Sequence, residues 1–370
     1  MKILICSREY SPDITPVAFR AEALTQEFLR RGYQVDLFIP GNKVVTAQPG
    51  NLRMVTVGGY VWRKSVPETI FKGMVRNLLG VKNIRKLKKY LFYSRSPYGK
   101  ELATALKTKA ASNYDLVLSI GVPLMVHEGV RDFLKQGRCK CACTIADCSD
   151  PVYSGGDDVY APWVYWREKR ALKIFDYVTV RLEAAIPAFA HYKERDKIKV
   201  VSQGYDFGQI SLPEYHKNPV PTFAFAGRFY RHIRNPYQFF EYLRNLSGAF
   251  KFYLYLDKDS QKMVEPYLQD IKDKVQVHDF VPREVLLPKL AKMDFLLNFV
   301  NAGRPHQLPS KIIDYAFTGR PILNISCEQF KAETFKNFLQ GRYEEALQVN
   351  WQQHDIRVIA DKFLALVPKT

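Results

Sequence analysis

The sequence lacks the features that mark several large classes of protein. No apolar run in its 370 residues approaches the roughly 20 residues that a membrane-spanning helix needs. Residues 1–6 enter an apolar, strand-like segment without the layout of a signal peptide. No Gly-x-Gly-x-x-Gly motif follows this strand, which disfavours a redox dinucleotide fold of the usual kind. These absences predict a cytoplasmic protein.

Cysteine and histidine are scarce, with six and seven residues respectively. Cys139, Cys141 and Cys143 alternate, so that in a strand they share one face, and no histidine stands near them at the spacing of a metal site. We therefore expect buried, reduced thiols, with no metal and no cofactor.

Positive charge is in excess, and the formal net charge is +18 at pH 7. This excess implies an anionic partner, which is a phosphosugar, a membrane surface or a nucleic acid. Residues 60–100 are rich in lysine and arginine. These basic residues alternate with aromatic and aliphatic residues at helical spacing. The segment suits either an anionic membrane surface or an ordinary solvated helix. No recognised nucleic-acid motif is present, and we expect no nucleic-acid partner.

Strand-like and helix-like segments alternate and predict an α/β fold. Residues 2–6, 18–31 and 35–39 have the pattern of a strand, a helix and a strand, which is the first unit of a doubly wound sheet. The alternation starts again with a strand at 222–226. We expect one domain at 1–200, a second at 201–350, and a C-terminal helical segment at 351–370 that packs back on the first domain.

Residues 304–325 carry the clearest chemistry. Ser310 suits the N-cap of a helix that stops at Gly319, before Pro321 and a short strand. The free amides at such a helix start attract phosphate, and Asp314, one turn further, is placed to accept from ribose hydroxyls. The stretch therefore predicts either a nucleotide-sugar site or simply a capped helix with a solvated acid.

An ordered set of segments resembles the retaining GT-B glycosyltransferases, and within them the broad family 4. The segments that carry the resemblance are 30–35, 146–151, 201–206, 225–236, 275–282 and 309–321. The resemblance implies two Rossmann-like, doubly wound domains that face a central cleft. The first would bind the acceptor, and the second would bind the nucleotide-sugar donor.

The resemblance also assigns a donor site. Arg228 and Arg234 are expected on the pyrophosphate, since arginine forks suit phosphate oxygens, with Arg231 as the substitute for Arg234. The other expected donor residues are His306, Ser310, Lys311 and Asp314. His306 and Asp314 stand where the family has two glutamates, and a histidine cannot accept from a sugar hydroxyl as a carboxylate does.

Four further residues complete the expected site. Thr15 and Pro16 stand in the first loop, which should meet the acceptor or the donor phosphate and where the family commonly has two glycines. His127 and Asp150 are the expected catalytic groups, because both follow strands near their carboxyl ends. For His127 the alternative is a structural histidine.

The function that the resemblance implies is metal-independent, retaining hexosyl transfer. The sugar would pass from a nucleotide-diphosphate-sugar to a glycan or lipid-linked acceptor in cell-surface polysaccharide synthesis. The enzyme would act in the cytoplasm, peripherally on the inner face of the membrane. A catalytically impaired GT-B relative that binds a glycan, a membrane or a partner protein is the alternative, because of His306.

Overall fold

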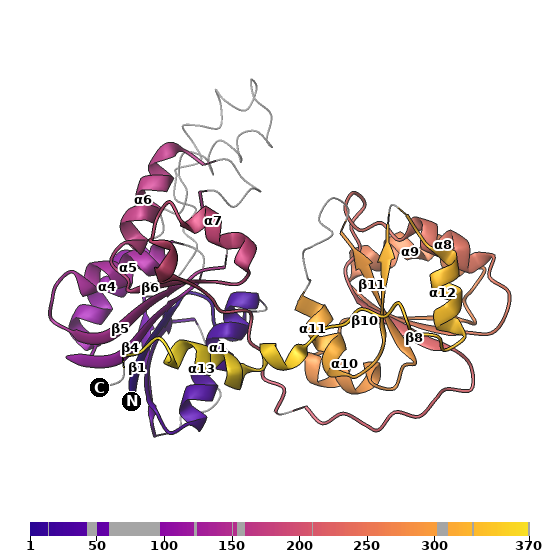
Figure 1. The fold of residues 1–370 in the computed structure, drawn as a ribbon, viewed down its shortest axis with the longest axis horizontal. Helices are drawn as coiled ribbons and strands as arrows, with labels where there is room; N and C mark the ends of the chain where they lie inside the picture. Colours follow the sequence, from indigo (N-terminus) through magenta and orange to yellow (C-terminus); the bar gives the residue numbers. More distant parts are fainter. Residues whose placement is uncertain are drawn as a thin grey trace. The chain divides into compact units, whose positions relative to one another are not determined.

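The computed structural model describes residues 1–13, 15–42, 50–58, 97–121, 124–149, 151–153, 160–208, 210–301, 310–327 and 329–368. The chain forms two compact units, which are Met1–Tyr205 together with Asp355–Thr370, and Asp206–His354. Each unit is an α/β structure around one parallel sheet, as the sequence predicts (Figure 1). Of the basic segment at 60–100, only residues 97–100 belong to the described residues, and Asp150 and His306 lie outside them.

Unit 1 has a seven-stranded sheet in the order β3-β2-β1-β4-β5-β6-β7, with every neighbouring pair parallel. Its strands are β1 (Lys2–Ser7), β2 (Gln34–Pro40), β3 (Leu52–Val57), β4 (Asn113–Ile120), β5 (Lys140–Asp147), β6 (Tyr177–Val180) and β7 (Ile198–Val200). The central strands are apolar and buried along nearly their whole length, because helices cover both faces of the sheet.

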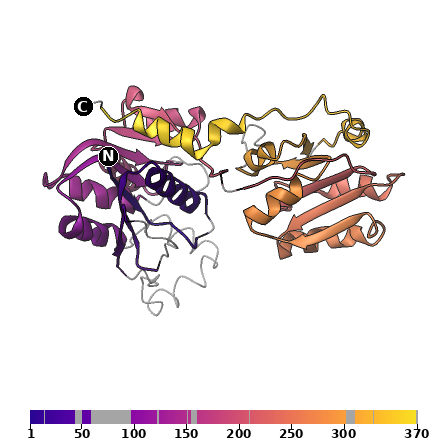
Figure 2. The ribbon, with the colours of Figure 1, turned by 90° about the horizontal axis from the view of Figure 1, so that it is seen from below.

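The helices of unit 1 form two layers. Its helices are α1 (Pro16–Arg30), α4 (Tyr98–Lys109), α5 (Met125–Leu134), α6 (Pro162–Leu172), α7 (Ile186–Phe189) and α13 (Ile356–Leu364), with short 3-10 turns η1 (Glu183–Ala185) and η2 (Arg195–Lys197). Leu24 and Phe28 of α1 share one core with Ile359 and Phe363 of α13, whereas α4 and α5 bury their apolar faces in the other core. The C-terminal helix α13 therefore belongs to the first unit, and Figure 2 shows it beside α1.

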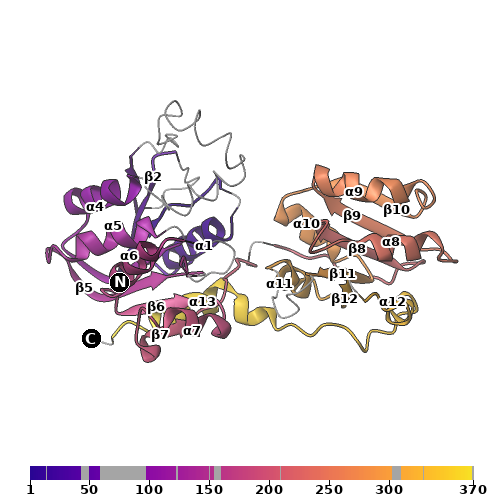
Figure 3. The ribbon, with the colours of Figure 1, turned by 90° about the horizontal axis from the view of Figure 1, so that it is seen from above.

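Unit 2 has a five-stranded parallel sheet in the order β10-β9-β8-β11-β12. Its elements are β8 (Thr222–Gly227), α8 (Tyr237–Arg244), β9 (Lys251–Leu256), α9 (Lys258–Leu268), β10 (Val275–Asp279), α10 (Arg283–Leu290), β11 (Phe295–Val300), α11 (Ser310–Phe317), β12 (Ile322–Ser326), α12 (Ala332–Leu339) and the 3-10 turn η3 (Trp351–His354). Helices α8, α9 and α12 pack on one face through a core rich in phenylalanine, and α10 and α11 pack on the other face (Figure 3).

Both strand orders reverse direction once, and this positions the candidate site. In unit 1 the reversal lies between β1 and β4, and in unit 2 it lies between β8 and β11. Chains that leave two adjacent strands in opposite directions open a crevice beyond the carboxyl ends of those strands, where ligands of such sheets bind. The residues that follow Ser7, Ile120, Gly227 and Val300 therefore lie where such sheets bind their ligands.

No helix within the described residues is long and apolar enough to cross a membrane.

Candidate functional site

A lysine with a buried amine lies at the switch point of unit 2. Lys311 is the second residue of α11, and its Nζ lies 4.0 Å from the centroid of the Phe225 ring. This Nζ is buried and makes no hydrogen bond to any described residue. Burial, and then repulsion from Arg234, hold the pKa of Lys311 well below its usual range. An unpartnered buried amine is costly, so its position suggests an anionic ligand.

The glycine at the end of β8 lets the chain pass close to this amine. Gly227 has a φ of +149°, which L side chains rarely adopt. A Cβ on Gly227 would lie 3.2 Å from the Phe225 ring and 3.4 Å from the Lys311 Nζ. Any side chain there would therefore fill the space beside the amine.

A second buried cation faces the same crevice from the loop after β8. Arg234 is 8% exposed, and its Nε donates to Asn301 Oδ1 at 3.0 Å while Nη1 donates to the Arg228 carbonyl at 3.2 Å. Asn301 directly follows β11, so the contact joins the two strands of the switch point. Burial lowers the pKa of Arg234, and no carboxylate of the described residues forms an ion pair with it.

The other two arginines of this loop differ from Arg234. Arg231 is exposed. The side chain of Arg228 is 57% exposed and forms an ion pair with Asp257, whose carboxylate also caps α9 by accepting from the Ser260 amide. Of the three arginines, Arg234 is the buried one and has no carboxylate partner among the described residues. The contact of Arg228 with a donor phosphate stays a prediction.

Asp314, one turn along α11 from Lys311, is held by an arginine of α10. Nε and Nη2 of Arg283 contact Oδ1 of Asp314 at 2.8 and 2.7 Å. Both contacts go to Oδ1, and within the described residues Oδ2 forms no hydrogen bond or ion pair. Burial raises the pKa of Asp314, and Arg283 opposes this shift. Arg283 thus orients the carboxylate and leaves one oxygen for a hydroxyl.

Arg283 also fixes the start of unit 2. Its Nη1 donates to the Asp206 carbonyl at 2.9 Å, and its guanidinium lies 4.9 Å from the centroid of the Phe207 ring. Phe207 stacks on Phe317 of α11 with ring centroids 4.4 Å apart. The helix that carries Lys311 and Asp314 is thereby anchored at both its polar and its apolar face.

In unit 1, Thr15 and Pro16 begin α1. Thr15 Oγ1 accepts from the Ala18 amide at 3.1 Å and donates to Glu9 Oε2 at 2.5 Å, so Thr15 is the N-cap residue. Pro16 holds the first helical position, and its carbonyl accepts from Gln203 Nε2 at 3.0 Å. Both residues lie at the carboxyl end of β1, and their contact with a ligand stays a prediction.

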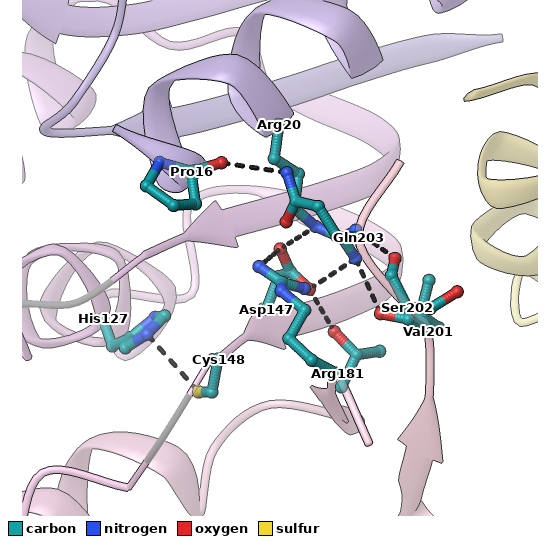
Figure 4. A network of polar contacts seen from close by, with 10 residues as sticks. Pro16, Arg20, His127, Asp147, Cys148, Arg181, Val201, Ser202 and Gln203 are labelled. Carbon is teal, nitrogen blue, oxygen red and sulfur yellow. Dashed lines mark hydrogen bonds and ion pairs between the residues drawn. The ribbon is translucent and has the colours of Figure 1, made fainter. Parts of the chain in front are cut away.

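His127 lies inside unit 1, as the third residue of α5. It is 3% exposed, and its Nδ1 lies 2.7 Å from Ser119 Oγ. Its Nε2 faces Cys148 (Figure 4), with Sγ 3.6 Å away. Burial lowers the pKa of His127 to about 4, so the ring is neutral at pH 7. Both ring nitrogens thus face protein groups, an arrangement typical of a structural histidine, and its catalytic role stays a prediction.

A buried polar network of unit 1 was not predicted from the sequence. Arg20 and Asp147 are both fully buried, and Arg181 and Thr179 also donate to the Asp147 carboxylate (Figure 4). Although burial alone raises the pKa of Asp147, the two guanidiniums hold it well below its usual range. An arginine at position 20, between the inward-facing Ala18 and Ala21, was the available signal.

No group of three or more histidine, cysteine, aspartate or glutamate side chains in the described part of the chain is placed to hold a metal ion. The cysteines within it are all free thiols.

No protein-family model matches the chain, and no curated protein matches it in sequence. Solved structures resemble it over nearly its whole length. The lipopolysaccharide outer core galactosyltransferase WaaB aligns over 98% of this chain and 95% of its own, at 12% identity and a TM-score of 0.53. HepE of Anabaena, solved with UDP and glucose, aligns over 99% and 98%, at 12% identity and a TM-score of 0.54.

The catalytic domain of starch synthase IV from Arabidopsis thaliana, bound to ADP and acarbose, aligns over 99% of this chain and 98% of its own, at 10% identity and a TM-score of 0.56. At these identities the likeness concerns the fold. Together with the two parallel sheets and their switch points, it shows that the chain has the GT-B fold.

Proposed function

We propose that the protein is a glycosyltransferase that takes its sugar from a nucleotide-diphosphate-sugar bound to unit 2. The observation that carries this proposal is a pair of buried basic groups, the Lys311 amine and the Arg234 guanidinium, beside Gly227 at the switch point of that unit. Neither group has a carboxylate partner within the described residues, so an anion would complete the site. A pyrophosphate fits, because it brings negative charge to both cations at once.

The same cations suit the reaction. When the bond between sugar and pyrophosphate breaks, the leaving group gains negative charge, and fixed cations stabilise that transition state more than the ground state. Lys311 and Arg234 would supply this charge together with the amides at the start of α11, so we propose that no metal is needed. Asp314 Oδ2 would accept from a ribose hydroxyl while Arg283 holds Oδ1.

The finer features of the proposal come from the resemblance to family 4. They are transfer of a hexose with retention of configuration, assisted by the leaving phosphate, and an acceptor that is a glycan or a lipid-linked glycan of surface polysaccharide synthesis. His127 and Asp150 remain the proposed catalytic residues, and unit 1 the proposed acceptor side.

A thermal-shift panel of uridine, guanosine, deoxythymidine, adenosine and cytidine sugar nucleotides tests the donor site. A ligand that binds only the folded state raises Tm. We expect one nucleotide class to raise the Tm of the parent protein and to lose this effect in Arg234→Ala. The matched control is Arg231→Ala, which removes an exposed arginine from the same loop and should keep the shift. If no sugar nucleotide shifts Tm, or if Arg231→Ala loses the shift and Arg234→Ala keeps it, the proposed site is wrong.

A catalytically impaired relative that binds glycan or a partner is the second candidate. The observation in its favour is the engagement of Asp314 by Arg283, which occupies part of the carboxylate that a ribose would need. Release of nucleotide in the presence of an acceptor pool separates the candidates, since a binding protein releases none. Nucleotide binding without any release, with all acceptors tried, favours the second.

A further inference from the structure

Helix α6 of unit 1 presents two tryptophans outward. Trp163 is 46% exposed and Trp166 is 64% exposed, although tryptophan is usually well covered in a folded protein. They are three residues apart, so they lie along one side of the helix. The buried residues of α6, among them Val164 and Leu172, lie on its other side.

Cations continue the same outward face. Arg170 and Lys173 are exposed and follow Trp166 at helical spacing, and Lys169 Nζ lies 5.9 Å from the Trp166 ring centroid. Arg167, at the border of this face, forms an ion pair with Glu128 of α5 at 2.8 Å. We call the side chains of Trp163, Trp166, Lys169, Arg170 and Lys173 the α6 face.

The α6 face carries no acidic side chain. The one carboxylate of the helix, Glu168, is 2% exposed and accepts from the amides of Val152 and Tyr153 at 2.7 and 3.0 Å. It therefore points into the unit, and within the described residues no carboxylate forms an ion pair with the cations of the α6 face. The ion pair of Arg167 with Glu128 ties α6 to the neighbouring helix α5 (Figure 1).

Tryptophan beside lysine and arginine is the side-chain chemistry of a membrane interface. Indole rings prefer the boundary between headgroups and acyl chains, and each cation near an anionic surface adds attraction. A neutral glycan would use the rings and leave the cations without a role. A protein partner would have to supply both an apolar recess and acidic residues at matching positions. An anionic bilayer presents an apolar interior and negatively charged headgroups everywhere on its surface.

From this juxtaposition we propose that the α6 face binds the surface of an anionic lipid bilayer, with Trp163 and Trp166 in the headgroup region. The proposal does not rest on the transferase activity, since vesicle binding is measured without any donor or acceptor. Binding through the α6 face would attach unit 1 to a membrane surface without inserting a helix across it.

Vesicle co-sedimentation tests the proposal directly. The full-length protein is mixed with phosphatidylcholine vesicles, either pure or with about a third phosphatidylglycerol. We expect binding to the anionic vesicles only, with a shift of tryptophan emission to shorter wavelength. The double variant Trp163→Ser/Trp166→Ser should bind at least about tenfold more weakly and lose most of the emission shift. Tyr237→Ser, at a 52% exposed aromatic residue of unit 2, should bind like the parent.

A charge-matched pair of variants separates the α6 face from the net charge of the chain. Lys169→Gln/Arg170→Gln/Lys173→Gln should weaken vesicle binding by about 30-fold or more. Lys107→Gln/Lys109→Gln/Lys135→Gln removes the same charge from exposed positions at the ends of α4 and α5, outside the basic segment 60–100, and should bind within a few-fold of the parent. Equal weakening by both triple variants would overturn the proposal, since net charge would then explain the binding.

A single-stranded oligonucleotide serves as the competing ligand, because bases also stack on exposed aromatic rings. If the tryptophan variant loses oligonucleotide binding and keeps vesicle binding, the α6 face is a nucleic-acid surface and the proposal is wrong. Unchanged vesicle binding by the tryptophan variant, with an unchanged Tm, also overturns it.

Discussion

Arg20 donates from Nε and Nη2 to the two carboxylate oxygens of Asp147, at 2.7 and 3.0 Å, inside unit 1 where neither residue is exposed. The same guanidinium donates to the carbonyls of Val201 and Ser202, at 3.2 and 2.5 Å. One side chain thus joins α1, the end of β5 and the segment after β7. Tyr205, three residues beyond Ser202, is the last residue of unit 1 before the chain enters unit 2.

Removal of Arg20 should destabilise unit 1 strongly. Arg20→Met leaves the Asp147 carboxylate buried with one arginine fewer and leaves two carbonyls without their donor, which costs about 3–5 kcal/mol of unfolding free energy. Arg181→Met should cost less, because the Arg181 side chain is 13% exposed and water can replace part of its contact. Urea unfolding of the two variants measures the difference. Equal losses of unfolding free energy in the two variants would show that the contacts of Arg20 with the two carbonyls add no stability.

The α/β alternation was predictable, because buried parallel strands and amphipathic helices have distinct apolar periods. The stop of α11 was predictable from Gly319, whose φ is +71°, and from Pro321. The Arg20 network was not predicted, since its partners come from positions up to 182 residues apart in the chain. For the same reason the sequence did not show that Arg283 would engage Asp314, or that Arg234 would be buried while Arg231 is exposed.

His127 should make stability fall as the solution is acidified. Its folded-state pKa of about 4 lies below the ordinary value near 6.5, so between these two values the unfolded chain binds a proton that the folded chain does not. The unfolding free energy should therefore fall by about 3 kcal/mol from pH 6.5 to pH 4, at about 1.4 kcal/mol for each pH unit. Denaturant unfolding across this range measures the slope.

The control for this slope is His127→Gln, which keeps a polar side chain and removes the titration. The part of the slope due to His127 is the difference between the parent protein and the variant. Parallel slopes in the two proteins would show that folding does not lower the pKa of His127. If His127→Gln also retains transfer activity, the histidine is structural and not catalytic.

Lys311→Met should affect stability and binding in opposite directions. The buried amine has no hydrogen-bond partner among the described residues, so replacing it with an apolar chain of similar length should raise the unfolding free energy of the ligand-free protein by about 1–3 kcal/mol. The same variant should lose the sugar-nucleotide thermal shift, because the pyrophosphate loses one of its cations. A structural lysine would give the reverse stability effect, with a lower Tm and an unchanged ligand shift.

Sugar-nucleotide binding should take up a proton at Lys311. In the free protein, burial and Arg234 hold the pKa of Lys311 well below its usual range, and the approach of a pyrophosphate must raise it. Affinity should therefore increase as pH falls through the window between the bound-state and the free-state pKa, because the complex holds more protons than the free protein there.

Titration calorimetry in two buffers of different ionisation enthalpy counts the protons that are taken up on binding. The ligand should be an intact sugar nucleotide, since its phosphates are esterified and do not titrate near neutral pH, unlike a terminal phosphate with a pKa near 6. Lys311→Met should show no such uptake at any pH. Equal binding enthalpies of the parent protein in both buffers, at every pH of a series across the range in which the protein is folded, would rule out Lys311 as the group that meets the pyrophosphate.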